Sequence, residues 1–166
     1  MFDGVDDYIE IADSPEMRMT QGGTIAVWIY PRTMGEVSGR IIDKSTTTSS
    51  TNGFMFYLSY KDKLSLGIES ARIHSPNDTI ILNAWNFVVA TITNSKKHLY
   101  VNGMVATASG ENSTVLPSNV AGVIRIGNRA GATDRTFDGL IDDVRIYNAA
   151  LSSAQIKQNY IAGLNS

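Results

Sequence analysis

The sequence contains no cysteine among its 166 residues. Disulfide bonds, thiolate catalysis and zinc–thiolate sites are therefore excluded. The chain also lacks an apolar run of the ~20 residues that a membrane-spanning helix needs, and it does not start with a basic and apolar signal peptide. Its formal net charge is only -2, which provides no basic surface for the phosphates of nucleic acid. We expect neither membrane insertion nor nucleic-acid binding.

The composition of the sequence is that of a folded domain. Hydrophobic residues make up 43% of the sequence and charged residues 18%, which is typical of a globular protein and not of a disordered chain. A chain of this length can bury a core without disulfides or metal ions to hold it together. No linker divides the sequence. We therefore expect a single domain over residues 1–166, excised from a larger protein.

Short strand patterns separated by turn signals fill most of the chain. The predicted strands cover residues 8–12, 24–30, 39–43, 54–60, 64–69, 85–93, 123–127 and 140–147, and a hairpin covers 98–106. Asn102-Gly103 between two alternating runs predicts a two-residue type I′ turn, because both positions need φ > 0. Many short strands with almost no helix indicate an all-β fold, an antiparallel β-sandwich or jelly roll with one short C-terminal helix.

The predicted helix covers residues 153–162. Ser152 is a favourable N-cap, and Gln155 three residues later completes a capping box. Ile156 and Tyr160 are four residues apart and share one helical face, which we expect to pack on the end of the sandwich. Gly163 is expected to end the helix in the left-handed conformation.

Two segments at opposite ends of the chain share an unusual pattern: Phe-Asp-Gly, then a pair of acids among alternating apolar residues. The first covers residues 2–11 and the second covers residues 137–148. A carboxylate inside a strand is costly unless hydrogen bonds, a basic partner or a metal ion compensates its charge. We predict that the strands at 8–11 and 140–147 are antiparallel neighbours in one sheet, with a cation site or a hydrogen-bonded acid cluster between them.

The carboxylates do not form the pair that glycosidic-bond cleavage requires. Such catalysis needs two carboxyl groups ~5–5.5 Å apart for retention, or ~6.5–9.5 Å for inversion. The five glutamates are scattered singly. Asp6/Asp7 and Asp142/Asp143 are adjacent, so each pair is expected to point to opposite faces of its strand. The two histidines are isolated, and no phosphate-binding loop or dinucleotide fingerprint is present. We expect a protein that is not an enzyme.

Aromatic side chains suggest a binding surface for sugars, because pyranose rings have apolar faces and hydroxyl rims. The candidates are Trp28, Tyr30 and Tyr57, with Tyr60 and Trp85 in addition. Trp28 and Tyr30 alternate with aliphatic residues, so they lie on the outer face of their strand if the aliphatic set forms the core. The alternative is that Trp28 packs under a loop. Trp85 opens its strand, and we expect it in the core or in loop packing.

Six segments resemble, in order, those of a known family. They are residues 2–9, 24–29, 85–88, 99–103, 126–127 and 139–148, followed by 150–152. Together they cover essentially the whole chain and resemble the laminin-G-like domains of the concanavalin A-like lectin/glucanase superfamily. The resemblance implies a jelly roll of two large antiparallel sheets, one of them concave.

The resemblance further implies a non-catalytic carbohydrate-binding or adhesion module of an extracellular or cell-surface protein, with a glycan or a surface protein as its partner. An alternative is a structural or protein-interaction domain of a pilus, viral or surface-layer protein, without a small ligand. A degenerate hydrolase is a third alternative, which the missing carboxylate pair disfavours.

Many of these domains hold a structural calcium ion, which takes six to eight oxygen ligands. The sequence has no EF-hand spacing, so a site has to be assembled from distant segments. The resemblance implies Asp142 as the first ligand, since it matches the acid of the family's Ile-Asp-x-Val-Arg strand. Asp3 and Asp7 match the acids of the opening motif and are the next ligands. The alternative is that these acids bind loop amides or pair with Arg145 and other basic residues.

Overall fold

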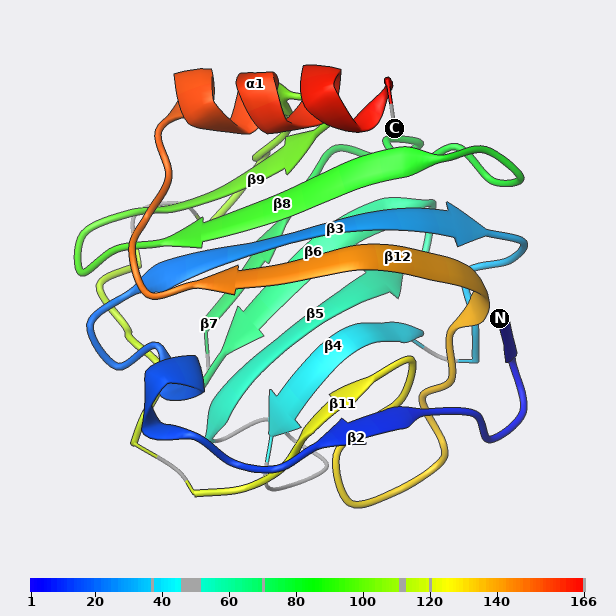
Figure 1. Ribbon diagram of the computed structural model, residues 1–166, viewed down its shortest axis with the longest axis horizontal. Coiled ribbons are helices and arrows are strands. Elements are labelled where there is room, and N and C mark those ends of the chain that lie inside the picture. The colour runs from blue at the N-terminus through cyan, green and yellow to red at the C-terminus, as the bar shows by residue number, and fades with distance from the viewer. Residues whose placement is uncertain (37, 46–51, 70, 111–112, 120, 166) are drawn as a thin grey trace.

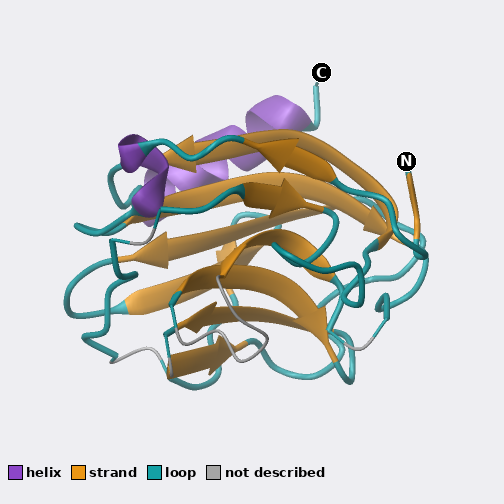
Figure 2. Cartoon of the chain, turned by 90° about the horizontal axis from the view of Figure 1, so that it is seen from below, coloured by secondary structure: helices purple, strands orange, loops and turns teal. Residues whose placement is uncertain are grey.

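The computed structural model describes residues 1–36, 38–45, 52–69, 71–110, 113–119 and 121–165. In these residues two six-stranded antiparallel sheets pack face to face (Figure 1). Figure 2, seen from below, shows the strands in curved layers with the helix outside them. The predicted all-β sandwich with one short C-terminal helix is therefore confirmed. Within the described part of the chain, no helix has the length and apolar character to cross a membrane.

Each sheet draws its strands from both ends of the chain. Sheet A has the order β1 (Phe2–Asp3), β12 (Asp138–Tyr147), β3 (Gly23–Pro31), β8 (Asn86–Ile92), β9 (Lys97–Val101) and β10 (Met104–Val105). Sheet B has the order β2 (Ile9–Ile11), β11 (Ile124–Ile126), β4 (Arg40–Ser45), β5 (Gly53–Ser59), β6 (Lys63–Ile68) and β7 (Ala71–His74). A short 3₁₀ helix, η1 (Pro15–Arg18), follows β2, and helix α1 (Ser153–Gly163) follows β12.

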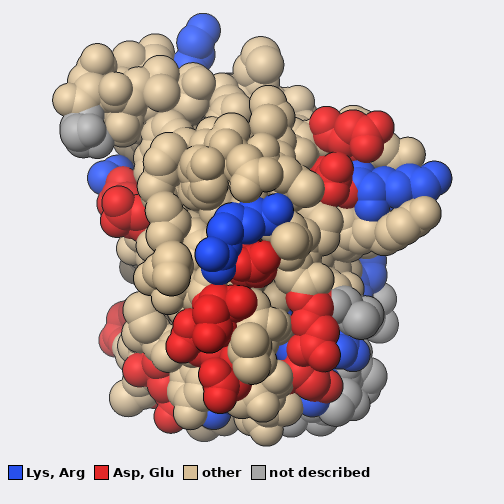
Figure 3. All heavy atoms as spheres, turned by 90° about the vertical axis from the view of Figure 1, so that its right-hand side faces the viewer, with Lys and Arg blue, Asp and Glu red and all other residues tan. Residues whose placement is uncertain are grey.

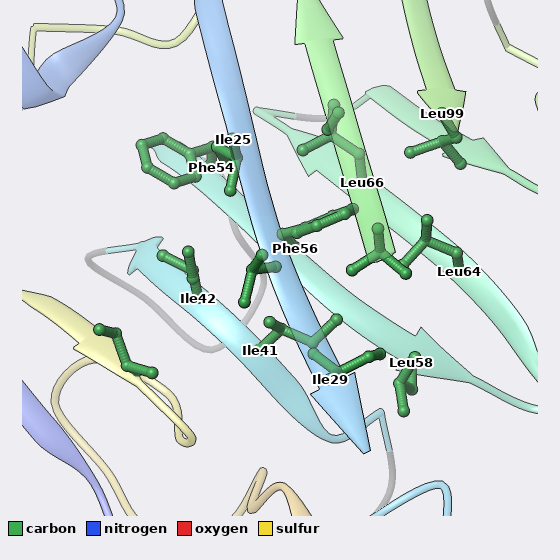
Figure 4. Packing of buried hydrophobic residues seen from close by; sticks show 14 of the residues in the cluster. Ile25, Ile29, Ile41, Ile42, Phe54, Phe56, Leu58, Leu64, Leu66 and Leu99 are labelled. Atoms are coloured by element: carbon green, nitrogen blue, oxygen red, sulfur yellow. The ribbon is translucent and has the colours of Figure 1, made fainter. Parts of the chain in front are cut away.

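The core fills the space between the sheets with alternate residues of each strand. Ile25 and Ile29 of β3 face Phe56 of β5 across this space, and all three are fully buried (Figure 4). On β8 the inward side chains include Val88 and Ile92, which are completely buried. Removing each large aliphatic or aromatic side chain from water contributes about 1.5–3 kcal/mol, so this alternation supplies the main stabilising energy of the sandwich.

The predicted turn at Asn102-Gly103 is confirmed. Asn102 and Gly103 have φ of 51° and 78°, as a type I′ turn requires, and they join β9 to β10. Lys61 and Asp62 have φ of 63° and 51° and lie in the turn between β5 and β6. Strands β1 and β7 and helix η1 were not predicted.

The predicted pairing of the two acid-bearing strands is wrong. Strand β2 lies in sheet B beside β11, whereas β12 lies in sheet A beside β3. The chain ends do meet, but through β1: Phe2 pairs with Gly139, and Asp3 pairs with Asp138. Gly4, with φ of 83°, begins the turn that takes the chain out of sheet A toward sheet B. A continuous strand pattern in the sequence is thus divided between the two sheets.

A buried ion pair lies on the side of sheet B that faces away from the core. Asp43 of β4 is 0% exposed and accepts a hydrogen bond from Arg40 Nε at 2.8 Å. Its other oxygen accepts from the N–H and hydroxyl of Ser45 and from the N–H of Ala130. Both carboxylate oxygens are therefore hydrogen-bonded, as burial of a charge requires. The interaction ties β4 to the loop that follows β11.

Replacing Asp43 with alanine is expected to lower the free energy of unfolding by about 3–5 kcal/mol, because Arg40 would remain as a buried charge without its partner. Urea denaturation followed by circular dichroism measures this loss. Glu10→Ala is the matched control: Glu10 pairs with Arg125 at 2.9 Å on the same sheet but is 43% exposed, so a loss below about 1 kcal/mol is expected. Equal losses in the two variants would contradict a role for burial of the Asp43 carboxylate.

Candidate ligand-binding site

Helix α1 packs on the face of sheet A that points away from the core. Ala26 and Trp28 of β3 point to this outer face, and Ile156 of α1 is fully buried against it. The Trp28 ring stacks on Tyr160 of α1, with 5.7 Å between the ring centroids, and lies 5.2 Å from the ring of Phe87. The predicted capping box is present, and the predicted helical face makes the contact. The helix covers the outer face of sheet A, however, and not the end of the sandwich.

The contact between Trp28 and α1 explains the glycine at the end of the helix. Trp28 lies on the predicted outer face but is only 9% exposed, because the helix rather than a loop covers it. The predicted left-handed conformation of Gly163 is wrong: α1 continues through this residue, and its C-cap is Leu164 with φ of -72°. A Cβ at Gly163 would lie 2.5 Å from Trp28 Nε1, so glycine permits the close approach of helix and indole.

A pocket of about 600 Å³ lies where the end of α1 meets β12 and β3. Its lining residues are Trp28, Trp85, Asp142, Asp143, Arg145, Gly163 and Leu164. Trp85 is 44% exposed, and the ring of Tyr30 packs edge-on against it, with 5.8 Å between centroids. Of the two places expected for Trp85, the core is wrong, because this residue stands just before β8 and outside its alternation. Its contact with Tyr30 is packing from a loop, and the ring stays partly exposed. The pocket therefore presents an indole ring that Tyr30 supports from the side.

A β-bulge brings both acids of β12 to this pocket. The register between β12 and β3 shifts between Asp142 and Arg145, and Asp143 has φ of 49°. An extra residue in a bulge re-aims the neighbouring side chains, and aspartate tolerates the left-handed conformation better than most residues. The expectation that Asp142 and Asp143 point to opposite faces is therefore wrong, because regular alternation stops at this position.

The charges in the pocket do not cancel. Arg145 donates from Nε to Asp143 Oδ1 at 2.8 Å, and its Nη2 lies 2.7 Å from Asp143 Oδ2. Burial alone would lower the pKa of Arg145, but the hydrogen bonds to Asp143 and Tyr147 outweigh it and raise this pKa above its ordinary value. Asp142 accepts the N–H of Asp143 at 2.7 Å, and in the described ranges no basic side chain forms an ion pair with it. Two carboxylates and one guanidinium thus leave one net negative charge.

A second group of acids lies at the start of the chain. Carboxylate oxygens of Asp3, Asp6 and Asp7 lie within 4.8 Å of one another, and all three side chains are exposed. Figure 3 shows acidic side chains gathered on the end of the molecule where the N-terminus lies. Asp7 Oδ2 accepts the N–H of Asp3, which fixes part of the group. The structure brings together Asp3 and Asp7, as predicted, and adds Asp6, which sequence reasoning missed because it assumed a regular strand.

Asp142 does not join this group. Asp3 pairs with Asp138, and Asp142 lies four residues further along β12, at about 3.3 Å per residue and hence roughly 13 Å away. The group at the N-terminus offers carboxylate oxygens, which are the ligands that calcium prefers. These donors fit a calcium ion in kind, and the further ligands would have to come from backbone carbonyls or water.

Tyr57, the third aromatic candidate, lies on the other sheet. It belongs to β5 in sheet B and is only 7% exposed, with the Arg40 guanidinium 4.8 Å from its ring centroid. Ser65, its partner on β6, bonds to Ser59 and to His74 Nδ1, each at 2.8 Å. The structure therefore separates Tyr57 from Trp28 and Tyr30 and leaves little of its ring open to a ligand.

Two facing antiparallel sheets, with a helix on the outer face of one, define a jelly roll of the concanavalin A-like type. The family model for laminin G-type domains, described as the concanavalin A-like lectin/glucanases superfamily, matches residues 3–157. This chain belongs to that superfamily, and the resemblance seen in the sequence motifs is confirmed. No curated protein matches the chain in sequence.

Solved structures of low sequence identity share the fold. The IT-sialidase CBM40 of Ruminococcus gnavus, bound to alpha2,3 sialyllactose, has a TM-score of 0.78 and 15% identity, over 96% of this chain and 95% of that chain. Domain 4 of AbnA, a GH43 extracellular arabinanase from Geobacillus stearothermophilus in complex with arabinotriose, has a TM-score of 0.68 and 20% identity, over 91% and 71%. The heptameric SAP-like pentraxin of Limulus polyphemus has a TM-score of 0.60 and 18% identity, over 95% and 82%. At these identities the similarity establishes the fold alone.

The two tryptophans are expected to differ sharply in their effect on stability. Trp28→Ala should lower the free energy of unfolding by about 3–5 kcal/mol, because it removes the buried ring that holds α1 on sheet A. Trp85→Ala should cost less than about 1 kcal/mol, because its ring is partly exposed and supports no buried layer. Urea denaturation followed by far-ultraviolet circular dichroism compares the variants without relying on tryptophan fluorescence. Similar losses would show that Trp85 is a packing residue and not a free surface.

Proposed function

We propose that this chain is a non-catalytic carbohydrate-binding module that holds a sugar in the pocket beside Trp85. The observation that carries the proposal is the exposed indole ring in a pocket of about 600 Å³ that also contains charged side chains. An indole ring offers an apolar surface to the face of a pyranose, while Asp142 and the Asp143–Arg145 pair offer acceptors and donors to its hydroxyl groups. Two relatives in fold were solved with oligosaccharides, sialyllactose and arabinotriose, which supports the same class of ligand here.

The pocket is suited to binding and not to glycosidic-bond cleavage. Asp143 accepts from Arg145 through both of its oxygens, which leaves neither to carry the proton that a general acid donates. Asp142 alone cannot supply both an acid and a nucleophile. Binding is expected to be weak, because one stacked ring and a few hydrogen bonds leave about 4–6 kcal/mol after the cost of ordering, or millimolar to tens of micromolar dissociation constants.

We place the module in an extracellular or cell-surface protein, with a glycan or a glycan-bearing surface protein as its partner. The relative from Geobacillus stearothermophilus is a domain of an extracellular enzyme, which supports this location. A domain that contacts only other proteins, without a small ligand, is the alternative, and the absence of glycan binding would favour it.

The proposal includes a structural calcium ion at Asp3, Asp6 and Asp7. Their carboxylate oxygens lie within 4.8 Å of one another, which suits ligands of a single ion with Ca–O distances of about 2.3–2.6 Å. The same segment pairs with β12 through Asp3, so a bound ion would fasten the start of the chain to sheet A.

Oligosaccharide titrations test the glycan site. Trp85→Ala is expected to weaken binding at least about tenfold, because it removes the ring on which the sugar stacks, a loss of about 1.4 kcal/mol or more. Amide chemical shifts in a titration series with chito-, arabino- and sialylated oligosaccharides measure the affinity. Tyr60→Ala is the matched control, since Tyr60 is an exposed aromatic residue that does not line the pocket. No shift with any oligosaccharide near millimolar concentration would favour the protein-interaction alternative.

Thermal unfolding with and without calcium tests the ion. A site in the folded chain should add about 2.7 kcal/mol at a hundredfold excess of calcium over its dissociation constant, and EDTA should remove this gain. Asp7→Asn should abolish the calcium-dependent shift. Asp142→Asn should keep the shift, because Asp142 lies apart from the cluster. Loss of the shift in Asp142→Asn but not in Asp7→Asn would move the ion to β12.

A further inference from the structure

We infer that the pocket beside Trp85 selects a sugar with a free, protonated amino group, such as a glucosamine oligosaccharide, over neutral and anionic sugars. The inference rests on the proposed glycan site and names the chemistry of its ligand. It follows from three features of the pocket, which are its net charge, the end of helix α1 and the exposed indole ring.

The first feature is the carboxylate of Asp142. Arg145 is bound at Nε and Nη2 by the two oxygens of Asp143, so this pair is close to neutral. Among the residues that the structure describes, Asp142 has no ion-pair partner, and its Oδ1 accepts a hydrogen bond from the backbone N–H of Asp143. A protonated amine in the pocket would supply the missing cation and form a charge-assisted hydrogen bond.

The second feature is the C-terminal end of α1, which reaches the pocket at Gly163 and Leu164. The aligned peptide dipoles give this end of a helix a partial negative charge of about half an elementary charge. The last turn of α1 contains no basic residue that would offset it. The field of the helix therefore acts in the same direction as the charge of Asp142, and both favour a cation.

The third feature is the partly exposed indole of Trp85. The face of an indole ring attracts ammonium groups as well as the apolar face of a sugar. Tyr30 packs on Trp85 edge-on, with an angle of 69° between the ring planes. An amino sugar can therefore use the same ring for stacking and for its charge.

The charge of the pocket disfavours an anionic sugar. The carboxylate of a sialic or uronic acid would enter beside Asp142 and Asp143, and the guanidinium of Arg145 is already paired with Asp143. Like charges at such short range oppose binding unless a free cation compensates them. This chain is therefore expected to differ in ligand from the CBM40 domain that was solved with sialyllactose, although the two share a fold.

The test compares three ligands at about pH 6, where the amine is protonated: the glucosamine trisaccharide, its fully N-acetylated counterpart, and sialyllactose. The two chito-oligosaccharides share their stereochemistry and differ in the charge of the amine. Wild-type protein should bind the free-amine form about tenfold more tightly than the acetylated form, and this preference should shrink as salt is raised. Sialyllactose should bind most weakly. Isothermal titration calorimetry measures the affinity. The amide chemical shifts of Gly163 and Leu164 show whether the ligand binds in this pocket.

Asp142→Asn should reduce the preference for the free amine to about twofold or less, because it removes the charge and the larger loss of affinity then falls on the free-amine form. Asp78→Asn is the matched control, because Asp78 is exposed and does not line the pocket. Equal binding of the two chito-oligosaccharides, lost in Trp85→Ala, would overturn the amine inference and leave the glycan function intact. If sialyllactose bound most tightly, the amine inference would likewise be overturned and the glycan function would remain. The absence of binding by all three ligands, in a folded protein, would overturn both.

Discussion

The alternation of side chains along β3 is the constraint on which the rest of the structure depends. Its odd-numbered residues Ile25, Val27 and Ile29 close the core against sheet B, and its even-numbered residues face outward. On that outer side Trp28 needs cover, since an exposed indole of this size would leave a large apolar surface in water. Helix α1 supplies the cover, and its end then forms one wall of the pocket. Core, helix and pocket thus follow from one strand.

The bulge in β12 determines where the acidic side chains of the pocket lie. Regular pleating would send Asp142 and Asp143 to opposite faces and place one of them toward the core. The left-handed conformation of Asp143 avoids this costly burial and turns both carboxylates to the outer side of sheet A. Arg145 then neutralises one of them through two contacts. The same bulge therefore keeps both carboxylates out of the core and places polar side chains beside Trp85.

Two groups of acidic side chains on the surface differ in character. Asp3, Asp6 and Asp7 form a compact group of carboxylates, which suits a hard cation. Asp142 and Asp143 lie beside an indole ring in a pocket, which suits an organic ligand with hydroxyl or ammonium groups.

The sequence by itself determined the features that arise from local patterns. Period-two alternation predicted the long strands, Asn102-Gly103 predicted its turn, and Ser152 with Gln155 predicted the start of the helix, because each depends on neighbouring residues only. Tertiary structure decided what depends on interrupted patterns and long-range contacts. The turn after Gly4 assigned the first acids to a cluster at the sheet edge, and the bulge at Asp143 turned two adjacent acids to one pocket. The docking of α1 buried Trp28 while Trp85 stayed open, a distinction that no local pattern contains, because it depends on which surface the last helix covers.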